Sequence, residues 1–170
     1  LFIGTIHSFC LEFILRPFSW KYNWARPKVI SYELQELFFI ENEDIKLDEN
    51  FGQNKFEELN KIAHKIDGSL NLDVDWNHTK TLEEVAQKYY RFQQKHNVID
   101  FNEILYRSLK LVSEQKFIAQ SLAAKFDEIL VDEFQDTNLY QYCILKELIL
   151  NGECSFFMVG NDKQRIFSFA

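Results

Sequence analysis

Turn-forming residues are scarce in this sequence, whose 170 residues include 5 Gly and 2 Pro. This scarcity predicts long elements with few breaks and favours helices over strands. The sequence also has no run of 18 apolar residues, which excludes a helix that spans a membrane. Its start lacks an initiating Met and the basic flank of a signal peptide. Both ends stop within an apolar pattern, so we expect a piece of a longer protein.

Cysteine is rare as well, with Cys10, Cys143 and Cys154 far apart. Three cysteines without a C-x-x-C pair exclude a disulfide framework, so we expect free thiols in a reducing compartment, the cytoplasm.

Basic residues are outnumbered by acidic residues, and the net charge is -7. Dedicated nucleic-acid modules usually carry a basic face, so this balance argues mildly against DNA binding but leaves room for a local contact track.

Apolar residues are abundant, at 46% of the chain, which excludes disorder and provides a core for one domain. Their spacing predicts a short buried strand over residues 1–5 and a buried helix over residues 8–15 that Pro17 stops. Further helices are predicted after a Ser31 cap and over residues 55–66, 81–96, 100–112 and 117–126.

The last part of the chain has a different pattern. Residues 128–132 are a predicted buried strand, residues 139–150 a helix, and residues 155–159 a second buried strand. Strand, helix and strand with short joins predict a parallel, right-handed unit. The fold class is therefore α/β, with residues 1–27 and 98–170 forming the α/β portion and residues 28–97 a mainly helical insertion.

Two acids, Asp132 and Glu133, end the first of these strands. Ligands of open α/β sheets bind beyond the carboxyl ends of the strands. An Asp there can hold hydrated Mg²⁺, and the next Glu can polarise a water for attack on a γ-phosphate. A strand that ends in an acidic turn before a helix has the same pattern, and the two residues alone do not separate these interpretations.

The residues from Val131 to Asn138 read V-D-E-F-Q-D-T-N. This segment resembles the Walker B segment D-E-[FY]-Q-D-T-N of the UvrD/Rep/PcrA superfamily-one DNA helicases. Three other segments resemble motifs of the family in the right order: T-I-H-S-F from Thr5, I-D-F-N-E-I-L from Ile99, and V-G-N-D-K-Q-R-I-F-S-F from Val159. The resemblance covers the whole chain, with a featureless middle.

The resemblance implies a partial RecA-like motor domain of an ATP-dependent 3′-to-5′ DNA helicase of repair or recombination, with ATP and Mg²⁺ as cofactors. Single-stranded DNA and its junctions with duplex are the implied partners. Asp132 would be the Mg²⁺ carboxylate and Glu133 the general base. Gln164 would touch the γ-phosphate, and Gln135 would connect the nucleotide site to neighbouring motifs.

The resemblance also implies DNA contacts. Thr5, His7 and Ser8 would contact the single-strand backbone, and Phe167 and Phe169 would stack on bases, each worth roughly 1–3 kcal/mol. Plainer interpretations remain for each set: the first three residues also fit a helix cap, and the two rings also fit one face of a strand.

Other polar and aromatic residues have plainer interpretations. Asp100 is expected to cap a helix rather than to act as a catalytic acid. Surface positions are expected for His64, His78 and His96. Packing is favoured for Trp20, Tyr22 and Trp24, with a DNA or adenine contact as the second option.

The sequence departs from the family pattern at three points. The phosphate loop G-x-x-x-x-G-K-[ST] does not occur and would lie upstream. Asn161 stands where the family usually has Asp, and Ala170 where many members have Arg. These departures leave two rivals open: the helicase portion of a helicase–nuclease subunit, and a non-catalytic module that binds DNA or a partner protein.

Because the phosphate loop and the second motor domain are missing, we expect this 170-residue chain alone not to hydrolyse ATP. A phosphate-release assay with and without single-stranded DNA checks this. DNA-stimulated ATPase activity of the purified chain would contradict the expectation.

Overall fold

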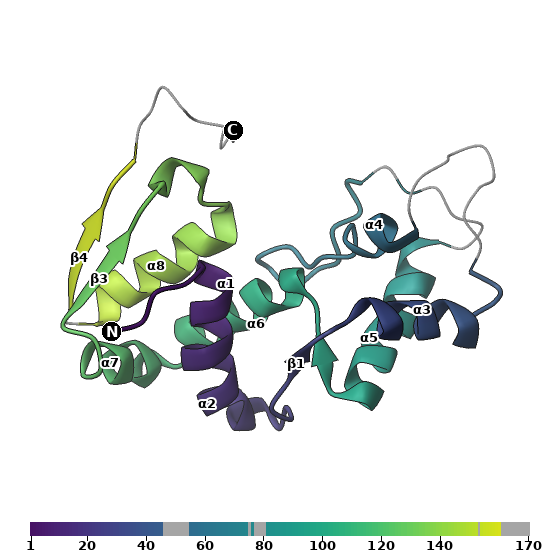
Figure 1. Cartoon of the computed structure of the whole chain (residues 1–170), viewed down its shortest axis with the longest axis horizontal. Helices are drawn as coiled ribbons and strands as arrows, with labels where there is room; N and C mark the ends of the chain where they lie inside the picture. The colour runs from purple at the N-terminus through teal and green to yellow at the C-terminus, as the bar shows by residue number, and fades with distance from the viewer. Residues whose placement is uncertain (46–54, 75, 77–80, 153, 161–170) are drawn as a thin grey trace. The chain divides into compact units, whose positions relative to one another are not determined.

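The computed structural model describes residues 1–45, 55–74, 76, 81–152 and 154–160 (Figure 1). The chain divides into two compact units. Unit 1 comprises Leu1–Trp24 and Leu105–Ala170, and unit 2 comprises Ala25–Ile104. The assignment of residues 28–97 to an insertion and of the remainder to a motor domain stays a prediction.

Unit 1 contains a parallel strand pair. Strand β3 (Glu128–Val131) pairs with β4 (Ser155–Met158), and helix α8 (Leu139–Asn151) connects them. The predicted parallel pairing and the mixed α/β class are confirmed. The prediction that both strands are buried was wrong, since Leu130 and its partner Phe157 are 68% and 57% exposed. The described sheet has two strands, and only Val131 among their residues is buried.

The N-terminal segment of unit 1 is helical almost throughout. Helix α1 (Ile6–Phe9) continues as the π-helix η1 (Cys10–Leu15), then α2 (Arg16–Phe18) and the 3₁₀ turn η2 (Ser19–Tyr22). Pro17 was predicted to stop this helix but lies inside it. It is the second residue of α2, which follows the π-helix η1 directly.

Residues 1–5 were predicted to form a buried strand, and this prediction was wrong. They have no strand structure, and Leu1 and Ile3 are largely exposed. A strand needs a neighbour for its backbone hydrogen bonds, and the described residues offer none here. Phe2 instead packs edge-on against Phe13, whose other contacts include Phe126 at a centroid distance of 5.0 Å.

Two helices complete unit 1. Helix α6 (Phe101–Glu114) contributes its residues from Leu105 onward, and α7 (Lys116–Ala123) packs against α8. The Cys10 thiol of η1 is fully buried and contacts the Ser108 hydroxyl of α6.

Unit 2 has a separate core between its helices. Helix α3 (Tyr32–Glu41) begins at the predicted Ser31 cap, and α5 (Leu82–His96) begins with a capping box of Thr81 and Glu84. The Phe38 ring lies 5.2 Å from the Tyr89 ring, centroid to centroid. Helix α4 (Lys55–Leu59) is much shorter than the predicted 55–66, because turns follow Leu59.

A second parallel pair, which the sequence did not reveal, joins the two ends of the segment predicted as the insertion. Strand β1 (Lys28–Val29) pairs with β2 (Val98–Ile99), and Ile30 N donates to Ile99 O at 3.0 Å. Strands of two residues carry no periodic pattern, so this pairing could not be predicted from the sequence.

None of the helices in the described part of the chain is both long and apolar enough to cross a membrane.

The environments of the cysteines predict different reactivities. Burial raises the pKa of the Cys10 thiol to about 12, whereas Cys143 and Cys154 are half-buried with smaller burial-driven rises in pKa. Because the thiolate is the reactive form, iodoacetamide should label Cys143 and Cys154 in the native protein, and Cys10 only after denaturation. Peptide mass spectrometry measures this, and equal labelling rates for all three would contradict the buried position of η1.

Candidate functional site

The candidate nucleotide site begins where β3 ends. Val131 is buried, and the next two residues, Asp132 and Glu133, are exposed. The strand pairing continues beyond β4, since Val159 N donates to Val131 O at 2.8 Å and Phe134 N donates to Val159 O at 2.9 Å. These bonds hold the segment after β4 beside the acidic pair, at one edge of the sheet.

Glu133 has an unusual backbone. Its φ of 50° and ψ of 42° lie in the left-handed region, where a residue with a β-carbon costs roughly 1–2 kcal/mol. The other non-glycine residues with positive φ in the described chain are Asn23 and Asn97, and Asn tolerates this region better. Strain of this kind persists where surrounding contacts impose it and is common at functional sites. Two hydrogen bonds hold the backbone of Glu133 here: its N–H donates to the side-chain Oδ1 of Asp132, and its carbonyl oxygen accepts from Asp136 N.

Gln135 connects the acidic pair to the segment after β4. Its side-chain Nε2 donates to Oε2 of Glu133, and the residue is 8% exposed. On its other side the Gly160 backbone is so close that a β-carbon there would lie 2.6 Å from Gln135 Oε1. Gln135 therefore lies between Glu133 and the first residues of the V-G-N-D-K-Q-R-I-F-S-F segment.

The end of the D-E-F-Q-D-T-N segment starts α8. Asn138 and Gln141 form a capping box, each side chain accepting a hydrogen bond from the other residue's backbone N–H. Thr137 is buried, and its hydroxyl donates to Phe134 O at 2.8 Å. The T-N pair thus fixes the direction in which the chain leaves the site.

The residues at this edge fit a magnesium ion held mostly by water and phosphate. Asp132 is exposed, and its Oδ1 accepts from Glu133 N at 2.9 Å, which fixes the orientation of the carboxylate. Among the described residues no three His, Cys, Asp or Glu side chains are grouped as an all-protein metal site would need. Mg²⁺ commonly takes one or two carboxylates together with waters and nucleotide phosphates.

The candidate DNA-backbone residues lie at the start of α1. Thr5 accepts from Ser8 N at 3.2 Å, so the capping interpretation holds for this residue. Ser8 donates to Thr5 O at 2.7 Å, which further fixes the turn. Partial burial lowers the pKa of His7, which favours a neutral ring at physiological pH. The DNA contacts of the three residues stay a prediction.

Five residues singled out in the sequence lie outside the described part of the chain: Gln164, Phe167, Phe169, Asn161 and Ala170. The same holds for His78. Their predicted roles stay predictions.

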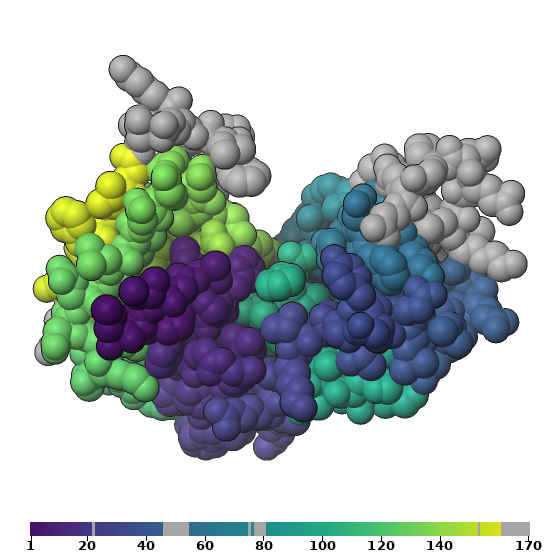
Figure 2. All heavy atoms as spheres, viewed as in Figure 1, coloured from purple at the N-terminus to yellow at the C-terminus, as the bar shows by residue number. Residues whose placement is uncertain are grey.

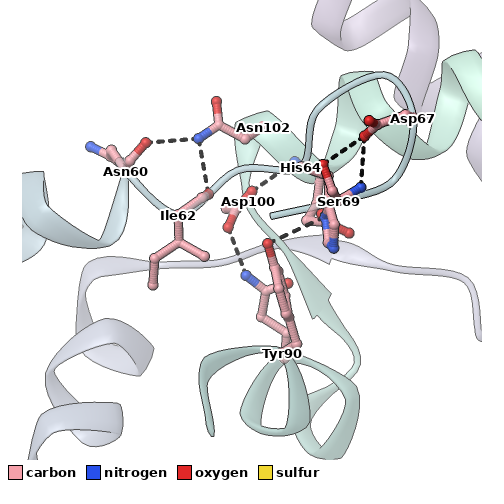
Figure 3. A network of polar contacts seen from close by, with 10 residues as sticks. Asn60, Ile62, His64, Asp67, Ser69, Tyr90, Asp100 and Asn102 are labelled. Atoms are coloured by element: carbon pink, nitrogen blue, oxygen red, sulfur yellow. Dashed lines mark hydrogen bonds and ion pairs between the residues drawn. The ribbon is translucent and has the colours of Figure 1, made fainter. Parts of the chain in front are cut away.

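The D-F-N-E segment forms a network of polar contacts in unit 2 (Figure 3). Asp100 accepts from Glu103 N at 2.8 Å, which confirms the predicted cap, and from Gln93 Nε2 at 2.7 Å. Glu103, 2% exposed, reaches the His64 ring, which stacks on Tyr90. The expectation that His64 is a surface residue was wrong. The contact between His64 and Glu103 could not be predicted from the sequence, because 39 positions separate the two residues.

The third polar side chain of that segment, Asn102, donates to the backbone oxygens of Asn60 and Ile62 at 2.8 and 3.3 Å (Figure 3). These bonds hold the turns that follow α4. The expectation of a surface position was wrong for His96 too, since it is half-buried and its ring centroid lies 4.3 Å from that of Phe92. The hydrogen bonds of this network hold segments of unit 2 in position.

The whole chain matches one known protein family. Residues 1–170 fit the family model of the UvrD/REP helicase N-terminal domain. The chain belongs to the UvrD/REP helicase family. The family assignment agrees with the resemblance carried by the D-E-F-Q-D-T-N segment.

Several curated relatives within this family are similar to the chain. A probable DNA helicase II homolog of Mycoplasma genitalium is 30% identical over 178 aligned positions, which cover 97% of this chain and 25% of the relative. The RecB component of the RecBCD enzyme of Buchnera aphidicola is 28% identical, covering 86% of this chain and 12% of the relative. An ATP-dependent helicase/nuclease subunit of Bacillus pumilus is 38% identical, covering 51% and 8%. The chain thus spans a quarter or less of these relatives.

Because Gly160 lies so close to Gln135, replacing this glycine with alanine should disturb the Gln135 side chain. In the full-length UvrD/REP protein, Gly160→Ala should displace the Gln135 amide from Glu133, because a β-carbon would otherwise lie 2.6 Å from Gln135 Oε1. The resemblance predicts ATP hydrolysis by the full-length protein, and the loss of one hydrogen bond, about 1 kcal/mol, should lower that turnover by a few-fold to about tenfold.

The Gln135→Ala variant is the matched control. If both substitutions act on the same contact, the double variant should be no slower than Gln135→Ala alone. If the fold-loss of turnover in the double variant equals the product of the two single losses, the two residues do not share a contact. Unchanged turnover in Gly160→Ala would also contradict the shared contact.

Proposed function

We propose that the full-length protein is an ATP-dependent DNA helicase or translocase that moves 3′ to 5′ on single-stranded DNA and acts in DNA repair or recombination. In this proposal unit 1 is part of a RecA-like motor domain, and residues 28–97 are its insertion. The observation that carries the proposal is the strained, hydrogen-bonded Glu133 directly after Asp132 at the carboxyl end of a parallel strand.

In the proposed site Asp132 would hold Mg²⁺ through its carboxylate, and waters and the phosphates of ATP would supply the other ligands. Mg²⁺, when bound, supplies charge that stabilises the phosphates of ATP. Glu133 is the general base: its carboxylate orients the attacking water and accepts its proton. The contact from Gln135 fixes the rotamer of Glu133, so the base is in place before the nucleotide arrives.

The contacts of Gln135 support a link between the proposed nucleotide site and the proposed DNA-binding residues. Gln135 touches Glu133 on one side and lies against Gly160 on the other. Gly160 begins the segment in which Gln164 would contact the γ-phosphate and Phe167 and Phe169 would stack on bases. A change in the nucleotide is therefore proposed to reach the DNA-binding rings through a few residues.

A helicase–nuclease protein is the second candidate. Its support is the similarity to RecB of a RecBCD enzyme and to an ATP-dependent helicase/nuclease subunit. The same site would drive DNA translocation there. The three free thiols support a reducing compartment, so we place either protein in the cytoplasm.

Glu133→Gln in the full-length protein tests the proposed base. The substitution keeps the size of the side chain but removes the proton acceptor, so ATP turnover should fall by about 10²- to 10⁴-fold while DNA binding persists. Steady-state phosphate release and fluorescence anisotropy with single-stranded DNA measure the two properties.

Glu128→Gln is the matched control, since Glu128 is an exposed carboxylate at the opposite end of the same strand. It should leave turnover unchanged. Equal turnover in Glu133→Gln and the unsubstituted protein would remove Glu133 from the proposed role.

A further inference from the structure

A surface patch in unit 1 has no role in the candidate nucleotide site. It consists of Trp20 and Lys21 on η2 and of Phe117 on α7, which we name the aromatic–lysine patch. The Lys21 ammonium lies 5.0 Å from the Trp20 ring and 5.1 Å from the Phe117 ring. Phe18 supports the patch, since its ring packs edge-on against Phe117 with a centroid distance of 5.7 Å.

The patch is exposed rather than part of the core. The Trp20 side chain is 60% exposed and that of Phe117 36%, so the favoured interpretation of Trp20 as a packing residue was wrong. Trp24, by contrast, is half-buried, with the Arg107 guanidinium 4.8 Å from its ring. Figure 2 shows the N-terminal segment of unit 1, in purple, at the molecular surface.

The backbone presents Trp20 in a fixed direction. The 3₁₀ turn η2 closes at Asn23, whose left-handed conformation lets its N–H bond to Trp20 O at 3.1 Å. Ser19, buried at 3% exposure, accepts from Trp24 N. A large ring held on a tight turn loses little further freedom when a flat partner stacks on it.

Lys21 differs from many other lysines of the chain in having no acidic partner. Among the described residues no carboxylate lies within ion-pair distance of it, and its contacts are the two rings. In unit 2, five lysines are each paired with a carboxylate: Lys55, Lys61, Lys65, Lys88 and Lys95. The charge of Lys21 is therefore available to an incoming anion.

The distribution of charge favours unit 1 for an anionic partner. Its sequence has nine basic and ten acidic residues, whereas unit 2 has ten basic and sixteen acidic. Nearly all of the net negative charge of the chain thus belongs to unit 2, which repels a phosphate backbone.

We propose that the aromatic–lysine patch is an additional contact site for single-stranded DNA, distinct from the family segments at Thr5 and Phe167. This proposal rests on the proposed function. One base stacks on the exposed Trp20 ring, and the adjacent phosphate pairs with the Lys21 ammonium. Ring faces combined with an unpaired cation are the groups with which proteins hold single strands without sequence preference. Phe117 offers a second ring on the other side of the cation.

Binding of fluorescein-labelled oligothymidine to the full-length protein, followed by anisotropy over a range of salt concentrations, tests the proposal. Trp20→Ala should raise the Kd by about 5- to 100-fold, which corresponds to the loss of one stacked base. Trp20→Phe should restore most of the affinity. Lys21→Ala should reduce the slope of log affinity against log salt by about 0.7, the value for one phosphate contact on a single strand.

Two matched controls come from unit 2. Tyr32→Ala removes a ring that is 73% exposed, and Lys65→Ala removes an exposed lysine that is paired with Asp73. Neither should change the affinity or the salt slope. Thermal unfolding of all variants verifies that they fold, which is expected because the substituted side chains are exposed.

The outcomes separate this proposal from the proposed function. If Trp20→Ala and Lys21→Ala bind like the controls while the unsubstituted protein binds DNA and hydrolyses ATP, the patch proposal alone is overturned. If the unsubstituted protein does not bind single-stranded DNA, both proposals fail.

Discussion

The backbone hydrogen bonds between β3 and β4, and their continuation at Val159, hold the candidate nucleotide site together. They place two segments that are more than twenty residues apart in the sequence at the same edge of a parallel sheet. The acidic pair, Gln135 and Gly160 all owe their positions to this ladder. The turn after β3 adds the left-handed Glu133, whose backbone bonds to Asp132 Oδ1 and to Asp136 N.

Side-chain hydrogen bonds hold segments of unit 2 in place, as the backbone hydrogen bonds between β3 and β4 do in unit 1. Asp100 caps α6, and Asn102 and Glu103 stand in its first turn. Their side chains hold α5 and the turns after α4. Burying carboxylates is costly unless they are hydrogen-bonded, so these partners are needed for the fold. The polar side chains of the D-F-N-E segment thus position parts of unit 2, and the predicted cap at Asp100 is confirmed.

Features set by nearby residues could be predicted from the sequence. A cap needs partners three positions apart, so the helix starts at Ser31 and Thr81 and the cap at Asp100 were predicted correctly. Features that need distant partners could not be predicted. Residues 1–5 have the pattern of a strand but no neighbouring strand in the described chain. The helix from Lys55 ends early because Asn102 binds the turns that follow it. At the site, Asp132 and Glu133 were located by the strand end, whereas the left-handed backbone of Glu133 has no signal, since Glu does not favour positive φ. The contact of Gly160 with Gln135 likewise required the sheet register.

The pairing of β1 with β2 closes the segment between them into a loop whose ends are hydrogen-bonded to each other. The entropy cost of such a closure grows only logarithmically with the length of the loop. The closure entropy of that segment therefore depends little on the length of its turns, whereas the core between α3 and α5 constrains the helices themselves. A longer or shorter turn in this segment would thus leave the hydrogen bonds between β1 and β2 in place.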